Sequence, residues 1–137
     1  MLRKSLITIL MVAASMPAWG FDIKAGLWEV TRETESPFPD ELESEAHYVE
    51  CIPQEDINDP EGTFRSAFAE MGINNFQYSE IDNVINVKGV NTSYETDVTM
   101  DVLMTILSSE HTRTVTKING YESATMVQEA HWIKEDC

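Results

Sequence analysis

Hydrophobic and polar residues alternate along most of the chain, which is the pattern of β-strands with one buried and one solvated face. The first such segment, residues 26–35, sets Trp28, Val30 and Arg32 on one face and mainly polar residues on the other. A second strand is expected over 46–52 and ends at Pro53. The residues between these strands are rich in proline and carboxylates, which predicts a solvated loop.

The region from Pro53 to Gly72 departs from this alternation and predicts the helical part of the chain. Asp59 suits the N-cap position, Pro60 suits the first helical position, and Gly72 is a typical stop. Apolar residues recur here at helical spacing: Phe64, Ala67, Phe68 and Met71. We expect this stripe to cover the apolar face of a sheet.

After Gly72 the period of two returns and continues to the end of the chain. Further strands are predicted over 77–81, 84–90, 94–102, 111–118 and 123–134. Asn119–Gly120 is the strongest hairpin signal in the sequence. Such a run of hairpins builds an antiparallel meander, because neighbouring strands in sequence pair with each other.

These elements predict an α+β fold, in which a curved antiparallel meander sheet of about seven strands packs on one helix. The sheet would form a half-barrel with the helix on its concave side. The alternative is a closed all-β barrel or a two-sheet sandwich. Internal repeats and a second domain boundary are absent from the sequence, so one domain is expected.

The first 20 residues have the three parts of a secretory signal peptide: the basic pair Arg3 and Lys4, an apolar run over 6–14, and small residues at Ala18 and Gly20. The apolar run is too short to cross a bilayer as a helix, which disfavours a retained membrane anchor. Cleavage after Gly20 is favoured over cleavage after Ala18. We therefore expect residues 21–137 to be a single exported domain, periplasmic or secreted.

The chain carries 24 acidic residues against 9 basic ones, a formal net charge of −15. This charge repels phosphate backbones and anionic lipid surfaces, so it argues against nucleic-acid binding and peripheral membrane attachment. We interpret it first as a property of the whole solvated exterior. A dedicated cation site in the acidic loop at 40–45 is the weaker interpretation.

Cys51 and Cys137 are the two cysteines of the chain. An even number of cysteines in an oxidising compartment favours a disulfide, which here would close a loop of 86 residues and hold the C-terminus. A free redox thiol is disfavoured, because the sequence has no C-x-x-C motif and no lysine or histidine directly beside Cys51.

Motifs for catalysis, cofactors and metals are absent. His47, His111 and His131 stand far apart without an H-x-H or H-E-x-x-H spacing. The segment 56–67 departs from the EF-hand pattern, and no G-x-S-x-G elbow or glycine-rich phosphate loop occurs. Three methionines that resemble soft-metal ligands are expected in the core: Met100, Met104 and Met126. We therefore expect no enzymatic activity, no catalytic residues, no cofactor and no metal site.

Three sequence blocks carry a resemblance to a known family: 23–30 with Gly-Leu-Trp-Glu-Val, 51–56 with Cys-Ile-Pro-Gln-Glu-Asp, and 131–137 with the terminal cysteine. They resemble a family of bacterial exported proteins, mostly proteobacterial, that is known only as a domain of unknown function. The chain departs from it at Lys134 and Glu135, where many members have glycine, and it lacks additional central cysteines. The resemblance implies an exported location and a shared fold, and no activity.

Two functions are compatible with these patterns. In the first, the protein is a non-enzymatic module that holds a small apolar ligand between the concave sheet and the helix. The candidate lining residues are Trp28, Phe64, Phe68 and Met71. In the second, it is a cell-envelope interaction or stress-related protein that offers its acidic exterior or a sheet edge to a partner protein and has no pocket. The sequence names neither a ligand nor an oligomeric state.

Overall fold

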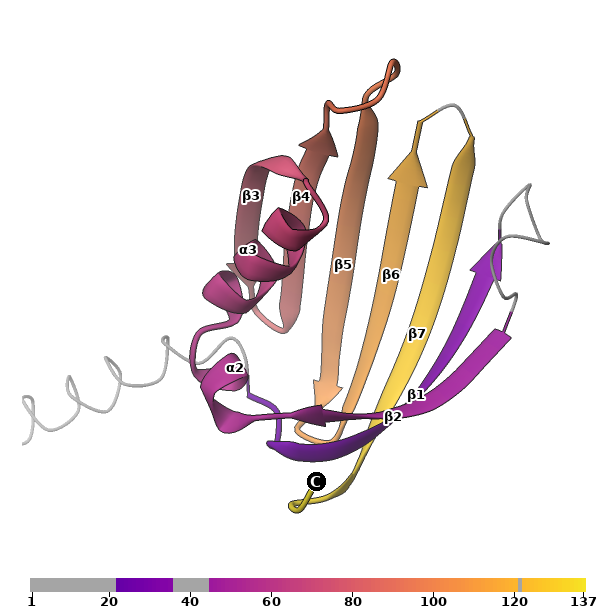
Figure 1. Ribbon diagram of the computed structural model, residues 1–137. Coiled ribbons are helices and arrows are strands. Elements are labelled where there is room, and N and C mark those ends of the chain that lie inside the picture. Colours follow the sequence, from indigo (N-terminus) through magenta and orange to yellow (C-terminus); the bar gives the residue numbers. More distant parts are fainter. Residues whose placement is uncertain (1–21, 36–44, 121) are drawn as a thin grey trace, which may run out of the picture.

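A computed structural model describes residues 22–35, 45–120 and 122–137 (Figure 1). The expected signal peptide and nearly all of the expected acidic loop lie outside these residues. The elements are β1 (Gly26–Glu35), β2 (Glu45–Ile52), α2 (Gln54–Asn58), α3 (Pro60–Glu70), β3 (Asn74–Ile81), β4 (Val84–Asn91), β5 (Val98–Ser108), β6 (His111–Asn119) and β7 (Ser123–Lys134).

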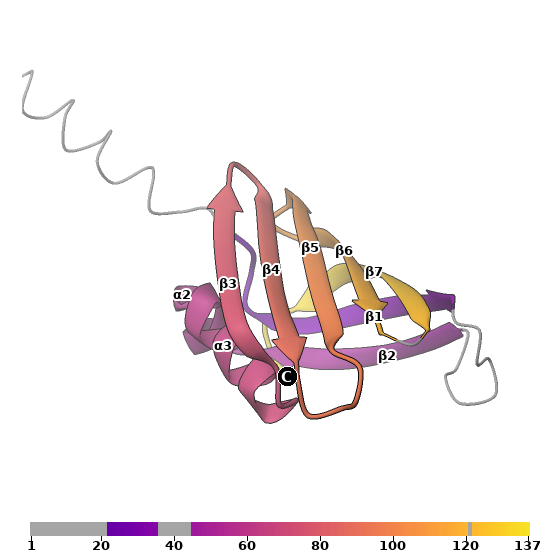
Figure 2. The same cartoon turned by 90° about the horizontal axis from the view of Figure 1, so that it is seen from above.

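The seven strands form one antiparallel sheet in the order β2-β1-β7-β6-β5-β4-β3. From β3 to β7 it is a meander, and β1 then joins the free side of β7. The sheet is strongly curved and does not close, since β2 and β3 are its two edges (Figure 2). The predicted α+β fold with a curved antiparallel sheet is therefore confirmed. The alternative, a closed barrel, does not form.

Two helices, rather than the single one predicted, lie on the concave side of the sheet (Figures 1 and 2). Asp59 separates them because its backbone is not helical, with φ −137° and ψ 75°. Its side chain accepts a hydrogen bond from the Gly62 amide at 3.0 Å, and Pro60 opens α3, so the predicted cap is confirmed. Neither helix in the described part of the chain is long and apolar enough to span a membrane.

Two predicted strands differ clearly in their bounds: β3 begins at Asn74 instead of residue 77, and β5 is shifted along the chain. The alternation over 94–102 predicted a strand there, but β5 begins at Val98 and continues to Ser108. The reason lies in its neighbours, since β4 ends at Asn91 opposite Val98 and β6 ends at Asn119 opposite Thr99. Residues before Val98 have no strand to pair with, so the alternation there does not become a strand.

The hydrophobic core lies between the helices and the concave face. Its buried members are Ile23, Trp28, Ile57, Phe68, Ile85, Val87, Val102 and Ile106. The Phe68 ring meets the edge of Phe76 with ring centroids 5.6 Å apart. Gly89 makes this approach possible, because a Cβ there would overlap Ile73 and lie 3.1 Å from the Phe68 ring.

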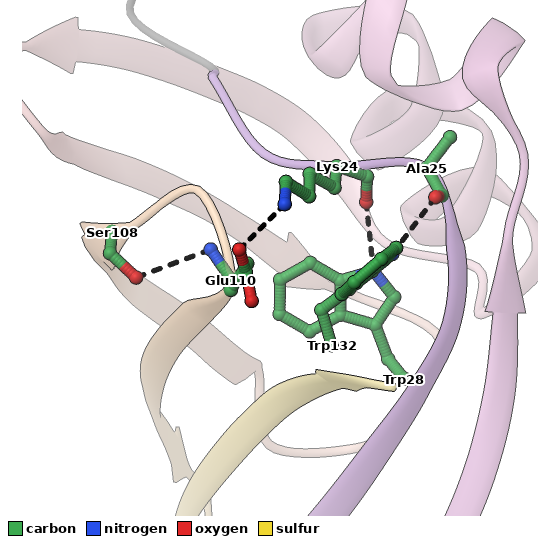
Figure 3. A network of polar contacts seen from close by, with 6 residues as sticks. All are labelled: Lys24, Ala25, Trp28, Ser108, Glu110 and Trp132. Carbon is green, nitrogen blue, oxygen red and sulfur yellow. Dashed lines mark hydrogen bonds and ion pairs between the residues drawn. The ribbon is translucent and has the colours of Figure 1, made fainter. Parts of the chain in front are cut away.

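The segment that leads into β1 is held by two indole rings (Figure 3). Trp28 Nε1 donates to the Lys24 carbonyl at 2.9 Å, and Trp132 Nε1 donates to the Ala25 carbonyl at 3.0 Å. The Lys24 ammonium lies 4.5 Å from the centre of the Trp132 ring and 2.6 Å from a Glu110 carboxylate oxygen. Both indole donors are thus used within the fold, which identifies the buried Trp28 and the half-buried Trp132 as structural residues.

Cys51 and Cys137 are joined by a disulfide, with Cα atoms 5.7 Å apart. The predicted bridge is therefore confirmed. It links the edge strand β2 to the segment that follows β7, and thus spans β1, which lies between them.

Candidate functional site

Of the four residues expected to line a ligand pocket, three belong to the core or pack against it, and the fourth is exposed. Trp28 is fully buried and Phe68 is 2% exposed, and both are part of the core. Phe64 is half-buried, with its ring centroid 6.4 Å from that of Tyr78, whereas Met71 lies at the end of α3 and is 47% exposed. Phe64 and Phe68 therefore pack α3 onto the sheet, whereas Met71 remains outside the core.

The described residues form at least four surface clefts. Two of them, of about 650 and 630 Å³, lie at the ends of β3 to β5 and beside α2. The others measure about 550 Å³, next to Arg32, and about 350 Å³, next to Tyr94. None of these four is lined by the residues predicted for the pocket.

Beyond the helices, the concave face carries polar side chains from three adjacent strands. Strand alternation places Arg32 of β1 on the same face as Trp28 and Val30. Tyr48 of β2 lies opposite Val30, and Gln128 of β7 lies opposite Arg32. Gln128 Nε2 donates to the Tyr48 hydroxyl oxygen at 3.0 Å, so the two side chains meet across β1.

Arg32 is the unusual member of this group. Its Nε atom is buried and has no hydrogen-bond partner within the described part of the chain. The residue also lines the cleft of about 550 Å³, which we call the Arg32 cleft; its lining is Thr31, Arg32, Glu33, Ala46 and His47. An unpaired buried donor costs roughly 1–3 kcal/mol, so a feature of this kind calls for an explanation.

Burial also acts on two titratable groups of this face. It raises the pKa of the Tyr48 hydroxyl, as does the nearby Glu50 carboxylate, while Arg32 and the bond from Gln128 lower it. The pKa of Glu50 is raised because burial removes part of its hydration. Tyr48 thus remains a neutral phenol that is able to donate a hydrogen bond.

Glu50→Gln is expected to stabilise the protein at pH 7.5 and to have little effect at pH 3.5. Folding raises the pKa of Glu50, so the charged carboxylate is disfavoured in the native state. This penalty is fully present above the native pKa and absent below the ordinary value of about 4.3. Urea denaturation of both proteins at the two pH values measures the difference. If the free energies of unfolding of the two proteins differ more at pH 3.5 than at pH 7.5, the raised pKa of Glu50 is contradicted.

The opposite, convex face carries all three histidines: His111 and His131 are direct partners on β6 and β7, and His47 lies on β2. His47 Nε2 is 3.4 Å from a Glu29 carboxylate oxygen, and His111 Nε2 is 2.5 Å from Oε2 of Glu129. The rings of His111 and His131 are stacked with centroids 4.1 Å apart. Their distant positions in the sequence gave no indication of this arrangement.

The register of the β6–β7 hairpin explains why the histidine pair was missed. A two-residue loop at Asn119–Gly120 would place His111 opposite Gln128. The sheet instead pairs Asn119 with Ser123, and His111 then lies directly opposite His131. The hairpin was predicted, but a longer connection sets which side chains face each other.

Comparison with known proteins found no relative. No family model, no curated protein and no solved structure matches the chain. The resemblance to exported bacterial proteins stays a prediction. Statements about function therefore depend on the geometry of the two faces of the sheet.

Proposed function

We propose that the protein is an exported, non-enzymatic module that binds a small molecule with an apolar body and an anionic or carbonyl head group. The head group would lie in the Arg32 cleft. The observation that carries this proposal is the buried Arg32 Nε donor, which lacks a partner among the described residues. A ligand oxygen would supply the missing hydrogen bond once the Arg32 side chain turns its buried Nε toward the cleft.

The neighbouring groups suit such a head group. The guanidinium offers donors in a planar fork that fits a carboxylate. The Tyr48 hydroxyl accepts from Gln128, which leaves its own hydrogen available to the ligand. The neighbours on the same face are small and apolar: Ala46 opposite Arg32 on β2, and Val30 with Ala130 opposite it on β7. Val30 is buried, whereas Ala46 and Ala130 are half-buried and offer room and apolar surface for the body of the ligand.

Two observations support an exported location for this function. The Cys51–Cys137 disulfide is of a kind that persists in oxidising compartments. The first 20 residues also have the charge and hydrophobicity pattern of a signal peptide.

Arg32→Ala is expected to weaken binding of decanoate, a simple carboxylate with an apolar tail, by about 10- to 100-fold, because a hydrogen bond to a charged group contributes roughly 1.5–3 kcal/mol. Isothermal titration of the full exported protein measures the affinity. Decanol, which has the same tail without the charge, should bind less tightly to the unmodified protein and respond less to the substitution.

Arg113→Ala is the matched control, because Arg113 lies on the convex face and is 54% exposed. It should bind decanoate as the unmodified protein does. Equal affinities of Arg32→Ala and Arg113→Ala would contradict the proposal, as would the absence of saturable decanoate binding.

A second candidate function, docking of a cell-envelope protein, is favoured by the sheet edges. Val49 on edge strand β2 is 55% exposed, and Ile81 on edge strand β3 is 70% exposed. An extended segment of a partner can add to such an edge. Native mass spectrometry of the exported protein separates the two functions, since bound small-molecule mass supports the first and a protein complex supports the second.

A further inference from the structure

We propose that His111, Glu129 and His131 form a binding site for a divalent transition-metal ion, with Zn²⁺ as the representative ion. One ligand atom from each of the three side chains lies within 4.8 Å of the others. Imidazole nitrogens and carboxylate oxygens are the ordinary ligands of zinc in proteins. The site lies on the convex face, on β6 and β7, and shares no residue with the Arg32 cleft.

The backbone explains why these three side chains converge. His111 and His131 are direct partners in the β6–β7 register. Glu129 precedes His131 by two positions in β7, so both side chains leave the same face of the strand. The three residues therefore project from two hydrogen-bonded strands, which hold a ligand set more firmly than a loop does.

The distances are compatible with one ion. Zinc binds nitrogen and oxygen at about 2.0–2.2 Å, so the ligand atoms of one ion are closer together than 4.8 Å. His111 Nε2 and Glu129 Oε2 are already 2.5 Å apart, and an ion would take the place of this direct contact. To hold the ion, His111 Nε2 and Glu129 Oε2 would move apart and His131 would rotate toward them.

The exposure of the site indicates how it would be used. The His111 and Glu129 side chains are 32% and 35% exposed, and His131 is more exposed still. Two histidines and one glutamate supply three of the four tetrahedral positions, which leaves one position for water or for a donor from a partner molecule. Such an open site binds an exchangeable ion, in contrast to a closed structural site.

On balance, the charged groups around the three-residue site favour the binding of a cation. Glu29 of β1 lies opposite His131 and adds negative charge beside the site. Arg113 acts against the ion, since its Nε is 3.8 Å from Oε1 of Glu129. The net charge of −15 raises the local concentration of cations around the whole protein.

The test is isothermal titration of the metal-free protein with ZnCl₂ in millimolar MgCl₂. Magnesium occupies weak carboxylate sites and competes poorly for imidazole, so it separates this site from the acidic surface. We expect one Zn²⁺ per chain. His131→Gln should weaken binding by about tenfold or more, because one of three ligands is lost. Equal affinity of this variant and the unmodified protein would overturn the proposal.

His47→Gln is the matched control, because His47 lies on the same convex face and pairs with Glu29 outside the three-residue set. Its affinity for Zn²⁺ should stay within about twofold of the unmodified protein. In the NMR spectrum, substoichiometric Cu²⁺ should broaden the imidazole signals of His111 and His131 before those of His47. Equal broadening of all three histidines, or loss of Zn²⁺ binding in excess Mg²⁺, would show diffuse binding to the acidic surface and overturn the site.

Discussion

Replacing Cys51 and Cys137 together by serine is expected to lower the free energy of unfolding by about 4.5 kcal/mol. The bridge closes a loop of 86 residues, and the chain-entropy model gives this value for a loop of that length. The loss is a large fraction of the stability of an ordinary domain of this size. Urea denaturation followed by tryptophan fluorescence measures it, because the Trp28 and Trp132 rings lie in and beside the core.

Reduction provides the control for this prediction. Dithiothreitol should destabilise the unmodified protein by a similar amount and leave the Cys51→Ser/Cys137→Ser protein unchanged. If the reduced protein and the double variant unfold at the urea concentration of the oxidised protein, the bridge contributes nothing and the loop-closure argument fails.

Phe68→Ala is expected to lower the free energy of unfolding by about 3–5 kcal/mol, the range for truncation of a buried aromatic side chain. Phe68 is 2% exposed and contacts Phe76, while Gly89 leaves room for its ring. Truncation would leave a cavity between α3 and the sheet, because the strands beneath are held by the hydrogen bonds of the sheet. The same urea denaturation experiment measures the loss.

Met71→Ala is the comparison within the same predicted stripe. Met71 is 47% exposed, so its truncation should change stability by no more than about 0.5 kcal/mol. The two substitutions distinguish core packing from pocket lining. A small effect of Phe68→Ala together with a large effect of Met71→Ala would contradict the core described here.

Local signals were sufficient to predict several elements. The alternation around Trp28 predicted β1, and the Asp59–Pro60 pair predicted the start of α3, because caps and periodicity depend on near neighbours in sequence. Features that depend on how one strand pairs with its neighbours were harder to predict from the sequence. The start of β5 at Val98 depends on where β4 and β6 end, which its own sequence does not contain.

In the two candidate sites, too, some features follow from the local sequence and others depend on how the strands pair. Arg32 was correctly placed on the face of Trp28 and Val30, but the cleft that it lines also depends on β2, whose register no local signal sets. The His111–His131 pair depends on the length of one hairpin connection. A register shift of one residue would move one histidine to the opposite face of the sheet.

The position of β1 between β2 and β7 also determines the order in which the chain can fold. β1 and β7 are far apart in the sequence, so the second row of hydrogen bonds of β1 forms only once β7 has been made. Without β7, the described strands are a β1–β2 hairpin and a β3–β6 meander, with no strand to join them. Contacts of such high sequence separation slow folding, so we expect the joining of these two parts by β7 to be a slow step.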